Sequence, residues 1–267
     1  MCERFRVDRD GRFDLDDLAA KLADDVLCVA AMAVNNEIGT VQDMEVIARL
    51  VSRSGAVLVC DAVQAPLAMD IDVRELPIGA LSLSAHKLYG PKGIGALYLR
   101  RDLHQSVEPL IYGGGQQNGL RSGTLPTPLC VGFGAAVELA AAKDRHAERA
   151  RIAVMRDDFE TAIGSLDRTI LFNGSGAHRH PGNSNVRFGT CDARHLLSMM
   201  QPHLAASTGS ACTSGAIEPS HVLCAIGLSE IEANASVRFS FGKFNSVGDV
   251  DEAARIIAHA ISLDRAA

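Results

Sequence analysis

Apolar residues along the chain fall into short runs that alternate with segments of helical spacing. Four runs have the length of strands buried in a sheet: residues 26–34, 56–60, 79–84 and 94–99. After Asp43 the apolar positions recur every three or four residues, which predicts an amphipathic helix capped by Asp43. A second helix is expected from Asp14 onward, where acidic residues fill the first turn. This alternation indicates a parallel, doubly wound α/β sheet.

The pattern changes after a polar, glycine-rich loop at residues 113–126. A long helical stretch runs from Pro128 into the 150s, with a break expected near Lys143. The remaining pattern predicts a smaller α/β or α+β domain with five elements: strands near 184–188 and 236–241, and helices near 192–200, 218–226 and 247–262. We therefore expect a larger domain over residues 1–143 and a smaller one over residues 144–267.

Composition narrows the class of function. A length of 267 residues with 47% apolar residues is enough for two modest cores. The net charge of −6 argues against nucleic acid or an anionic membrane as the main partner, and no apolar run is long enough to span a bilayer. The amino end lacks the apolar core of a signal peptide. Seven cysteines without regular spacing favour reduced thiols in the cytoplasm.

Two strand ends carry candidate chemistry. Asp61 closes one apolar run, and Ser84-Ala85-His86-Lys87 closes the next. In open α/β sheets, ligands bind beyond the carboxyl ends of the strands. An Asp there can keep a pyridine nitrogen protonated and a Lys can form a Schiff base, the two groups that a pyridoxal phosphate site needs. The same residues also allow a plain alternative, in which Asp61 caps a helix and Lys87 is a solvated cation.

Six motifs occur in order over nearly the whole chain: VNNEIG at 34–39, DAVQ at 61–64, SAHKLYGPKG at 84–93, RSGTLP at 121–126, SACTS at 210–214 and SVRFS at 236–240. Together they resemble the cysteine desulfurases of the NifS/IscS type, a branch of the class V aminotransferase family. The resemblance implies a pyridoxal-phosphate-dependent transferase of fold type I. It also implies that the protein is a cytoplasmic homodimer and binds no metal.

The resemblance assigns the cofactor site to five residues of the larger domain. Lys87 would be the catalytic Schiff-base lysine, and Asp61 would pair with the pyridinium nitrogen. Gln64 would hydrogen-bond the phenolic oxygen of the cofactor. Ser84 and His86 would bind its phosphate. His86 is also expected to be a catalytic residue.

Substrate and partner contacts follow from the same resemblance. Asn36 and Arg238 would hold the carboxylate of L-cysteine, a task that suits the guanidinium fork. Thr124 would reach the phosphate bound by the partner subunit. Cys212 would be the nucleophile that takes the sulfur as a persulfide, releases L-alanine and passes the sulfur to an acceptor protein for iron–sulfur clusters or thiolated tRNA. Small and hydroxyl residues over 206–215 predict a mobile loop around Cys212.

The family's chain is longer at its amino end, and no histidine precedes Asn36 to stack on the cofactor ring. We therefore expect an incomplete larger domain, an open side to its pocket and exposed apolar surface. Three alternatives remain: a catalytically silent fragment that acts through binding surfaces, a selenocysteine lyase and a class V transaminase. The nucleophile Cys212 disfavours the transaminase. The other six cysteines are interpreted as core or surface thiols.

Overall fold

The structure, a computed structural model, describes residues 1–189, 191–209 and 218–264. The chain divides into two compact units. Unit 1 comprises residues 1–18, 34–42 and 146–267, and unit 2 comprises residues 19–33 and 43–145. The expected boundary at 143/144 lies beside the observed one at 145/146. The prediction differs in two segments, because residues 1–18 and 34–42 group with the carboxy-terminal part of the chain.

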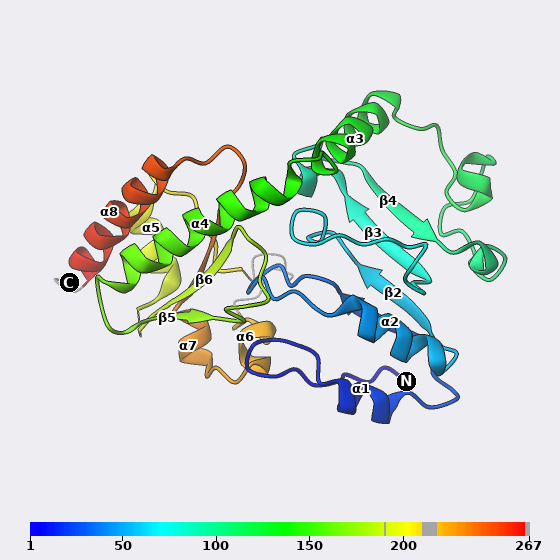
Figure 1. Ribbon diagram of the computed structural model, residues 1–267, viewed down its shortest axis with the longest axis horizontal. Helices are drawn as coiled ribbons and strands as arrows, with labels where there is room; N and C mark the ends of the chain where they lie inside the picture. Colours follow the sequence, from blue (N-terminus) through cyan, green and yellow to red (C-terminus); the bar gives the residue numbers. More distant parts are fainter. Residues whose placement is uncertain (190, 210–217, 265–267) are drawn as a thin grey trace. The chain divides into compact units, whose positions relative to one another are not determined.

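Unit 2 is built on a four-stranded sheet in the order β1-β2-β3-β4 (Figure 1). Its elements are β1 (Cys28–Met32), α2 (Met44–Arg53), β2 (Val57–Asp61), β3 (Ala80–Ser84), the 3-10 helix η1 (Ala85–Leu88), β4 (Gly95–Leu99), the 3-10 helices η2 (Arg101–Leu103) and η3 (Gln116–Gly119), and α3 (Thr127–Ala140). Helix α1 (Leu15–Lys21) begins in unit 1 and ends in unit 2. All four predicted strands and both early helices are present.

The direction of β4 makes this sheet parallel-rich and mixed, with one antiparallel strand at its edge. Strands β1, β2 and β3 are parallel, whereas β4 runs antiparallel to β3. Only the residues between Ser84 and Gly95 join these two strands, and they fold into η1 and a turn. Such a connection is too short for the crossover that a parallel neighbour requires.

Helix α2 covers one face of this sheet, lying along β2 (Figure 1). Its cap is the predicted one, since the side chain of Asp43 accepts a hydrogen bond from the backbone N–H of Val46 at 3.1 Å. The helix buries its apolar side: Met44, Ile47, Ala48 and Val51. Leu58 and Cys60 on β2 are each 1% exposed, which shows that this face is fully packed.

The opposite face of the same sheet is apolar and uncovered by the described residues. Alternate positions place Cys28 and Ala30 of β1 beside Val57 and Val59 of β2, and the register continues to Leu97 of β4. Cys28 and Ala30 are exposed, and the exposed fractions of Val59 and Leu97 are 37% and 64%. Parallel sheets are normally covered on both faces. The expectation of exposed apolar surface is therefore confirmed for this face, which we call the open face.

Unit 1 contains a three-stranded antiparallel sheet in the order β5-β6-β7. Its elements are α4 (Arg145–Gly164), β5 (Ile170–Asn173), β6 (Asn183–Phe188), α5 (Ala193–Met200), α6 (His221–Ala225), α7 (Glu230–Asn234), β7 (Ser236–Ser240) and α8 (Val247–Asp264). The antiparallel pairing makes this unit α+β. The chain between α3 and α4 is the break expected near Lys143. Strand β5 and helix α7 were not predicted.

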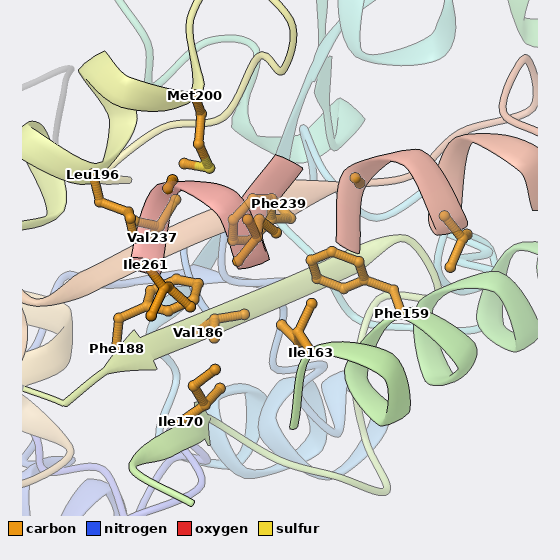
Figure 2. Packing of buried hydrophobic residues seen from close by; sticks show 14 of the residues in the cluster. Phe159, Ile163, Ile170, Val186, Phe188, Leu196, Met200, Val237, Phe239 and Ile261 are labelled. Carbon is orange, nitrogen blue, oxygen red and sulfur yellow. The ribbon is translucent and has the colours of Figure 1, made fainter. Parts of the chain in front are cut away.

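One face of this sheet packs into a complete core with α4, α5 and α8 (Figure 2). Phe159 of α4 is fully buried, and its ring centroid lies 5.0 Å from that of Phe239 on β7. Val237 is also fully buried and Phe239 is 3% exposed. The alternation of apolar and polar residues in SVRFS predicts this burial, because a strand's period of two places Val237 and Phe239 on one face. Alternate residues of β6 and β7 must therefore face the other side, which is polar.

Residues 34–42 belong to unit 1 because their backbone pairs with the residues just before β6. Thr40 forms a β-bridge with Arg179, and the N–H of His180 donates to the carbonyl of Gly39 at 2.7 Å. Gly39 has φ +73, and a Cβ there would lie 2.7 Å from the Cβ of Asn183. This close approach requires glycine at the end of the VNNEIG motif. The pairing is tertiary, so the local pattern could not assign these residues to a domain.

Candidate active site

The carboxyl ends of β2 and β3 bring two candidate residues to one edge of the unit 2 sheet. Asp61 is the last residue of β2 and pairs in register with Ser82 of β3. Ser84 ends β3, two residues further along, so Asp61 and Ser84 lie on the same face of the sheet. This is the open face. The arrangement agrees with the rule that ligands bind at the carboxyl ends of parallel strands.

Asp61 is half-buried and held by its own loop. One carboxylate oxygen accepts a hydrogen bond from the backbone N–H of Val63 at 2.9 Å. Its neighbour Cys60 points into the packed face, where burial, together with the nearby Asp61 charge, raises the thiol pKa to about 12. Cys60 is thus a structural thiol, while Asp61 presents its carboxylate on the opposite face.

Lys87 lies in the 3-10 helix η1, which directly follows β3. Ala85 and Leu88 are buried against Phe133 and Ala136 of α3, and this contact fixes the helix. Lys87 between them is half-buried.

Ser84 and His86 form a pair at the start of η1, with Ser84 Oγ 2.8 Å from His86 Nδ1. His86 is exposed. The helix ends at Tyr89, which adopts a left-handed conformation with φ 62. The next residue must be glycine, since a Cβ on Gly90 would lie 2.9 Å from the carbonyl oxygen of Ala85. Tight packing thereby explains the glycine that follows the tyrosine in the lysine motif.

Gln64 and Thr124 lie in loops of unit 2. Gln64 is half-buried in the turn after Asp61, closed by the N–H of Ala65 on the carbonyl of Ala62 at 3.0 Å. Thr124 is exposed, two residues after Ser122, whose buried hydroxyl donates to the carbonyl of Gly114 at 2.6 Å. The roles proposed for both residues stay predictions.

In unit 1 the structure brings Arg238 to the turn that carries Asn36. The guanidinium of Arg238 donates to the carbonyl oxygen of Asn36 at 2.8 Å. The turn is shaped by Asn35, whose side-chain oxygen accepts from the N–H groups of Glu37 and Ile38 at 2.9 and 3.0 Å. Two residues 202 positions apart in the sequence, both expected to bind a substrate carboxylate, therefore meet within one unit.

The sequence analysis missed the polar network that supports this turn. The side-chain amides of Asn183 and Asn185 donate to the carbonyl of Glu37 at 3.3 and 3.2 Å, and Asn173 donates to Asn185 at 2.8 Å. Ser220 donates to the Glu37 carboxylate at 2.6 Å. The alternation of Asn183 and Asn185 on a strand is the sequence signal that could have indicated this polar face.

Cys212 lies outside the described residues, as does the rest of segment 210–217. Part of the predicted loop is paired, since Ser207 forms a β-bridge with Arg238.

Burial and a hydrogen bond to the Asp264 carboxylate raise the pKa of the Cys191 thiol to about 11, which makes it a poor nucleophile at neutral pH. No cluster of three His, Cys, Asp or Glu side chains suited to a metal occurs in the described part of the chain.

Comparison with known proteins agrees with this geometry. The aminotransferase class V domain matches residues 2–253. Cysteine desulfurase IscS of Anaeromyxobacter sp. is 41% identical over 255 residues, covering 96% of this chain and 63% of that protein. The mitochondrial cysteine desulfurase of Saccharomyces cerevisiae is 41% identical over 97% of this chain and 52% of its own length. A solved NifS-like protein superposes with a TM-score of 0.89 at 28% identity, covering 98% of this chain and 68% of that one.

These matches define the class. The chain belongs to the class V aminotransferase family, and its fold is that of the NifS-like, pyridoxal-phosphate-dependent enzymes of fold type I. It spans 63% of the length of the Anaeromyxobacter relative. No helix among the described residues is long and apolar enough to cross a membrane.

Proposed function

We propose that this chain is a pyridoxal-phosphate-dependent cysteine desulfurase acting on L-cysteine. The single observation that carries the proposal is that Asp61 and Ser84, the latter beside His86 and Lys87, share one face at the carboxyl ends of parallel strands. The identity of 41% to named cysteine desulfurases supports this reaction over other class V chemistry.

The residues at the strand ends fit pyridoxal phosphate by their chemistry. Lys87 supplies the amine for the covalent link, and Asp61 supplies a carboxylate for the ring nitrogen. Ser84 and His86 offer two donors for the phosphate, and Gln64 offers an amide for the phenolic oxygen. When bound, the cofactor withdraws electrons from the α-carbon of the amino acid. The half-buried position of Asp61 suits this role, because an ion pair there is sheltered from solvent.

Arg238 and Asn36 are the residues we propose for the substrate carboxylate. The guanidinium is already oriented by its bond to the Asn36 carbonyl and by the backbone pairing of Arg238 with Ser207. A guanidinium with one fixed donor keeps others for a carboxylate. Preorganisation of this kind lowers the entropic cost of binding.

Cys212 is the proposed sulfur acceptor. In the net reaction the Cβ–S bond of L-cysteine breaks and an S–S bond forms on Cys212. The proton of the Cys212 thiol passes to the methyl group of the L-alanine that leaves. Atoms and electrons therefore balance without an external oxidant. The persulfide sulfur would then pass to an acceptor protein in the cytoplasm.

A homodimer is the assembly that we propose, with Thr124 directed to the partner's phosphate site. Helix α3 supports it, because Val131, Val137 and Leu139 are exposed by 67%, 42% and 67% although the helix is strongly apolar. Leu110 and Tyr112 in the preceding loop are also largely exposed. Apolar patches of this kind are typical of protein interfaces.

A second candidate function is a catalytically silent chain that acts only through binding surfaces. The open face favours this candidate, because an enzyme of this fold needs a cofactor site closed to water. Both candidates predict association with another polypeptide, but only the first predicts turnover.

The test is alanine formation from L-cysteine by the purified chain supplied with pyridoxal phosphate. Lys87→Ala should abolish both turnover and the absorbance of the bound cofactor. Cys212→Ala should keep the absorbance and lose turnover. No alanine from the unchanged chain, together with no cofactor absorbance, would favour the silent candidate.

Arg238→Ala tests the substrate site separately. Loss of a charge-assisted pair worth roughly 1.5–3 kcal/mol should lower the affinity for cysteine by about 10- to 150-fold, while the cofactor absorbance remains. Arg238→Lys should recover only part of the affinity, since lysine has no fork. Unchanged affinity in Arg238→Ala would remove the carboxylate role.

A further inference from the structure

Glu37 is a buried carboxylate to which none of the expected roles applies. It is 4% exposed, and its Oε2 accepts a short hydrogen bond of 2.6 Å from the hydroxyl of Ser220. A carboxylate is costly to bury, so its retention here needs a compensating arrangement. Every contact that follows lies within unit 1.

The same carboxylate touches the residues on both sides of segment 210–217. On one side, a Cβ on Gly209 would lie 3.1 Å from Glu37 Oε2, and Gly209 has φ +85, so its backbone rests against the carboxylate. On the other side, Ser220 caps α6 by accepting a hydrogen bond from the N–H of Leu223 at 3.2 Å while it donates to Glu37. One side chain thus forms a hydrogen bond to one flank of the segment and lies close to the other.

The main chain of Glu37 has separate supports. Its carbonyl is held by the amides of Asn183 and Asn185, and the preceding carbonyl, of Asn36, is held by Arg238. Removing the Glu37 side chain therefore leaves the bonds that place Asn36 and Arg238. The effects of the side chain on the flanks and of the main chain on the turn can be separated by mutation.

We propose that the Glu37 carboxylate is a positioning residue that fixes the flanks of segment 210–217 to the turn carrying Asn36. The proposal rests on the proposed function, in which Cys212 of that segment takes the sulfur. Glu37 acts through Ser220 and Gly209 and touches neither substrate nor cofactor. It sets the rate of sulfur transfer and leaves the affinity for L-cysteine to Asn36 and Arg238.

The kinetic test compares Glu37→Ala with Glu37→Gln in the full chain. Glu37→Ala should lower kcat by about 10- to 100-fold with KM unchanged, because a small displacement of a reacting group is costly. Glu37→Gln keeps an oxygen that can accept from Ser220 and should retain most of kcat. The matched control is Glu160→Gln: Glu160 also accepts from a serine hydroxyl, that of Ser184 at 2.7 Å, but on the other face of the sheet. The substitution Glu160→Gln should leave kcat unchanged.

A double-mutant cycle shows whether Glu37 acts through Ser220. If it does, Ser220→Ala should lower kcat, and Glu37→Ala with Ser220→Ala should be little worse than either alone. Additive losses, or a fall in kcat in Glu160→Gln equal to that in Glu37→Ala, would overturn the proposal.

Hydrogen exchange provides a readout that does not depend on turnover. In Glu37→Ala the amides of Leu223 and Cys224 should exchange about tenfold faster or more, because Ser220 loses a charge-assisted bond. Amides of α4 should be unaffected. If the unchanged chain forms no alanine, the proposed function fails, and the exchange alone decides on the contact: unchanged exchange at Leu223 would overturn it.

Discussion

The two sheets of this protein differ in the face that is not packed into a hydrophobic core. In unit 1 the apolar face of β5-β6-β7 packs into a complete core, and the polar face is satisfied by the turn at residues 34–42. In unit 2 one face of the sheet is packed by α2, while the other leaves Val59 and Leu97 exposed. The antiparallel sheet is therefore self-contained, and the parallel-rich sheet needs a covering layer. Candidate cofactor residues lie on the face that needs it.

The largest contrast is expected in stability. Phe159→Ala in the core of unit 1 should lower the free energy of unfolding by about 3–5 kcal/mol, because a fully buried aromatic ring is replaced by a cavity. Leu97→Ala on the open face should change it by less than about 0.5 kcal/mol. Urea unfolding followed by far-UV circular dichroism measures both. Similar losses in the two variants would mean that the open face is covered.

A second prediction concerns the pH dependence that a half-buried histidine of unit 1 gives to stability. His180 is half-buried, and burial followed by the charges of Arg156 and Arg149 lowers its pKa to about 4. Between pH 6.5 and 4 the unfolded state binds more protons at this position, so stability should be lost as pH falls through that window and stay constant above it. The loss attributable to His180 should be about 2–3 kcal/mol.

His180→Asn isolates this contribution. His180 Nδ1 accepts from the N–H of Gly182 at 3.0 Å, and the Asn oxygen can replace that acceptor without titrating. Unfolding free energies at pH 7 and pH 4.5 should then differ less than in the unchanged chain. The exposed His221→Asn serves as control, and an equal effect of the two substitutions would refute the assignment.

A third prediction concerns α7, a short helix of unit 1 that depends on its cap. Ser229 and Glu232 form a reciprocal capping box. Ser229→Ala should cost about 1 kcal/mol in unfolding free energy. One backbone N–H group of the capping box loses its acceptor, and the glutamate that accepts from the other N–H group loses its support from the serine. The control is Ser165→Ala, near the end of α4, which should cost less unfolding free energy.

The smallest effect on stability, but the most direct test of the open face, is Leu97→Lys. Unfolding free energy should change by less than about 0.5 kcal/mol, while concentration-dependent association should decrease. Sedimentation velocity over a range of concentrations measures it. Leu171→Lys, at a leucine that is 46% exposed on β5, should leave association unchanged. Equal sedimentation of Leu97→Lys and the unchanged chain would show that the open face does not drive association.

Much of this architecture is contained in local sequence pattern. Short apolar runs predicted β1 to β4, and the Asp43 cap and apolar spacing predicted α2, because these signals act over a few residues. Alternation in SVRFS predicted that Val237 and Phe239 face a core. The break near Lys143 was likewise predicted from the helical pattern. The four-residue β5 and the five-residue α7 are too short for such a pattern to identify.

The sequence by itself determined the candidate chemistry. It places an Asp and a Lys after successive apolar runs, and it contains six motifs in the order in which they occur in the family. Tertiary structure alone decided which face of a strand is covered, that β4 turns back antiparallel, and that residues 34–42 join the unit of β6 and β7. It also decided that Glu37, central in the VNNEIG motif, is buried against Ser220 from 183 positions away. Local pattern reports preferences of neighbouring residues, whereas burial of a charge depends on groups that meet only when the chain is folded.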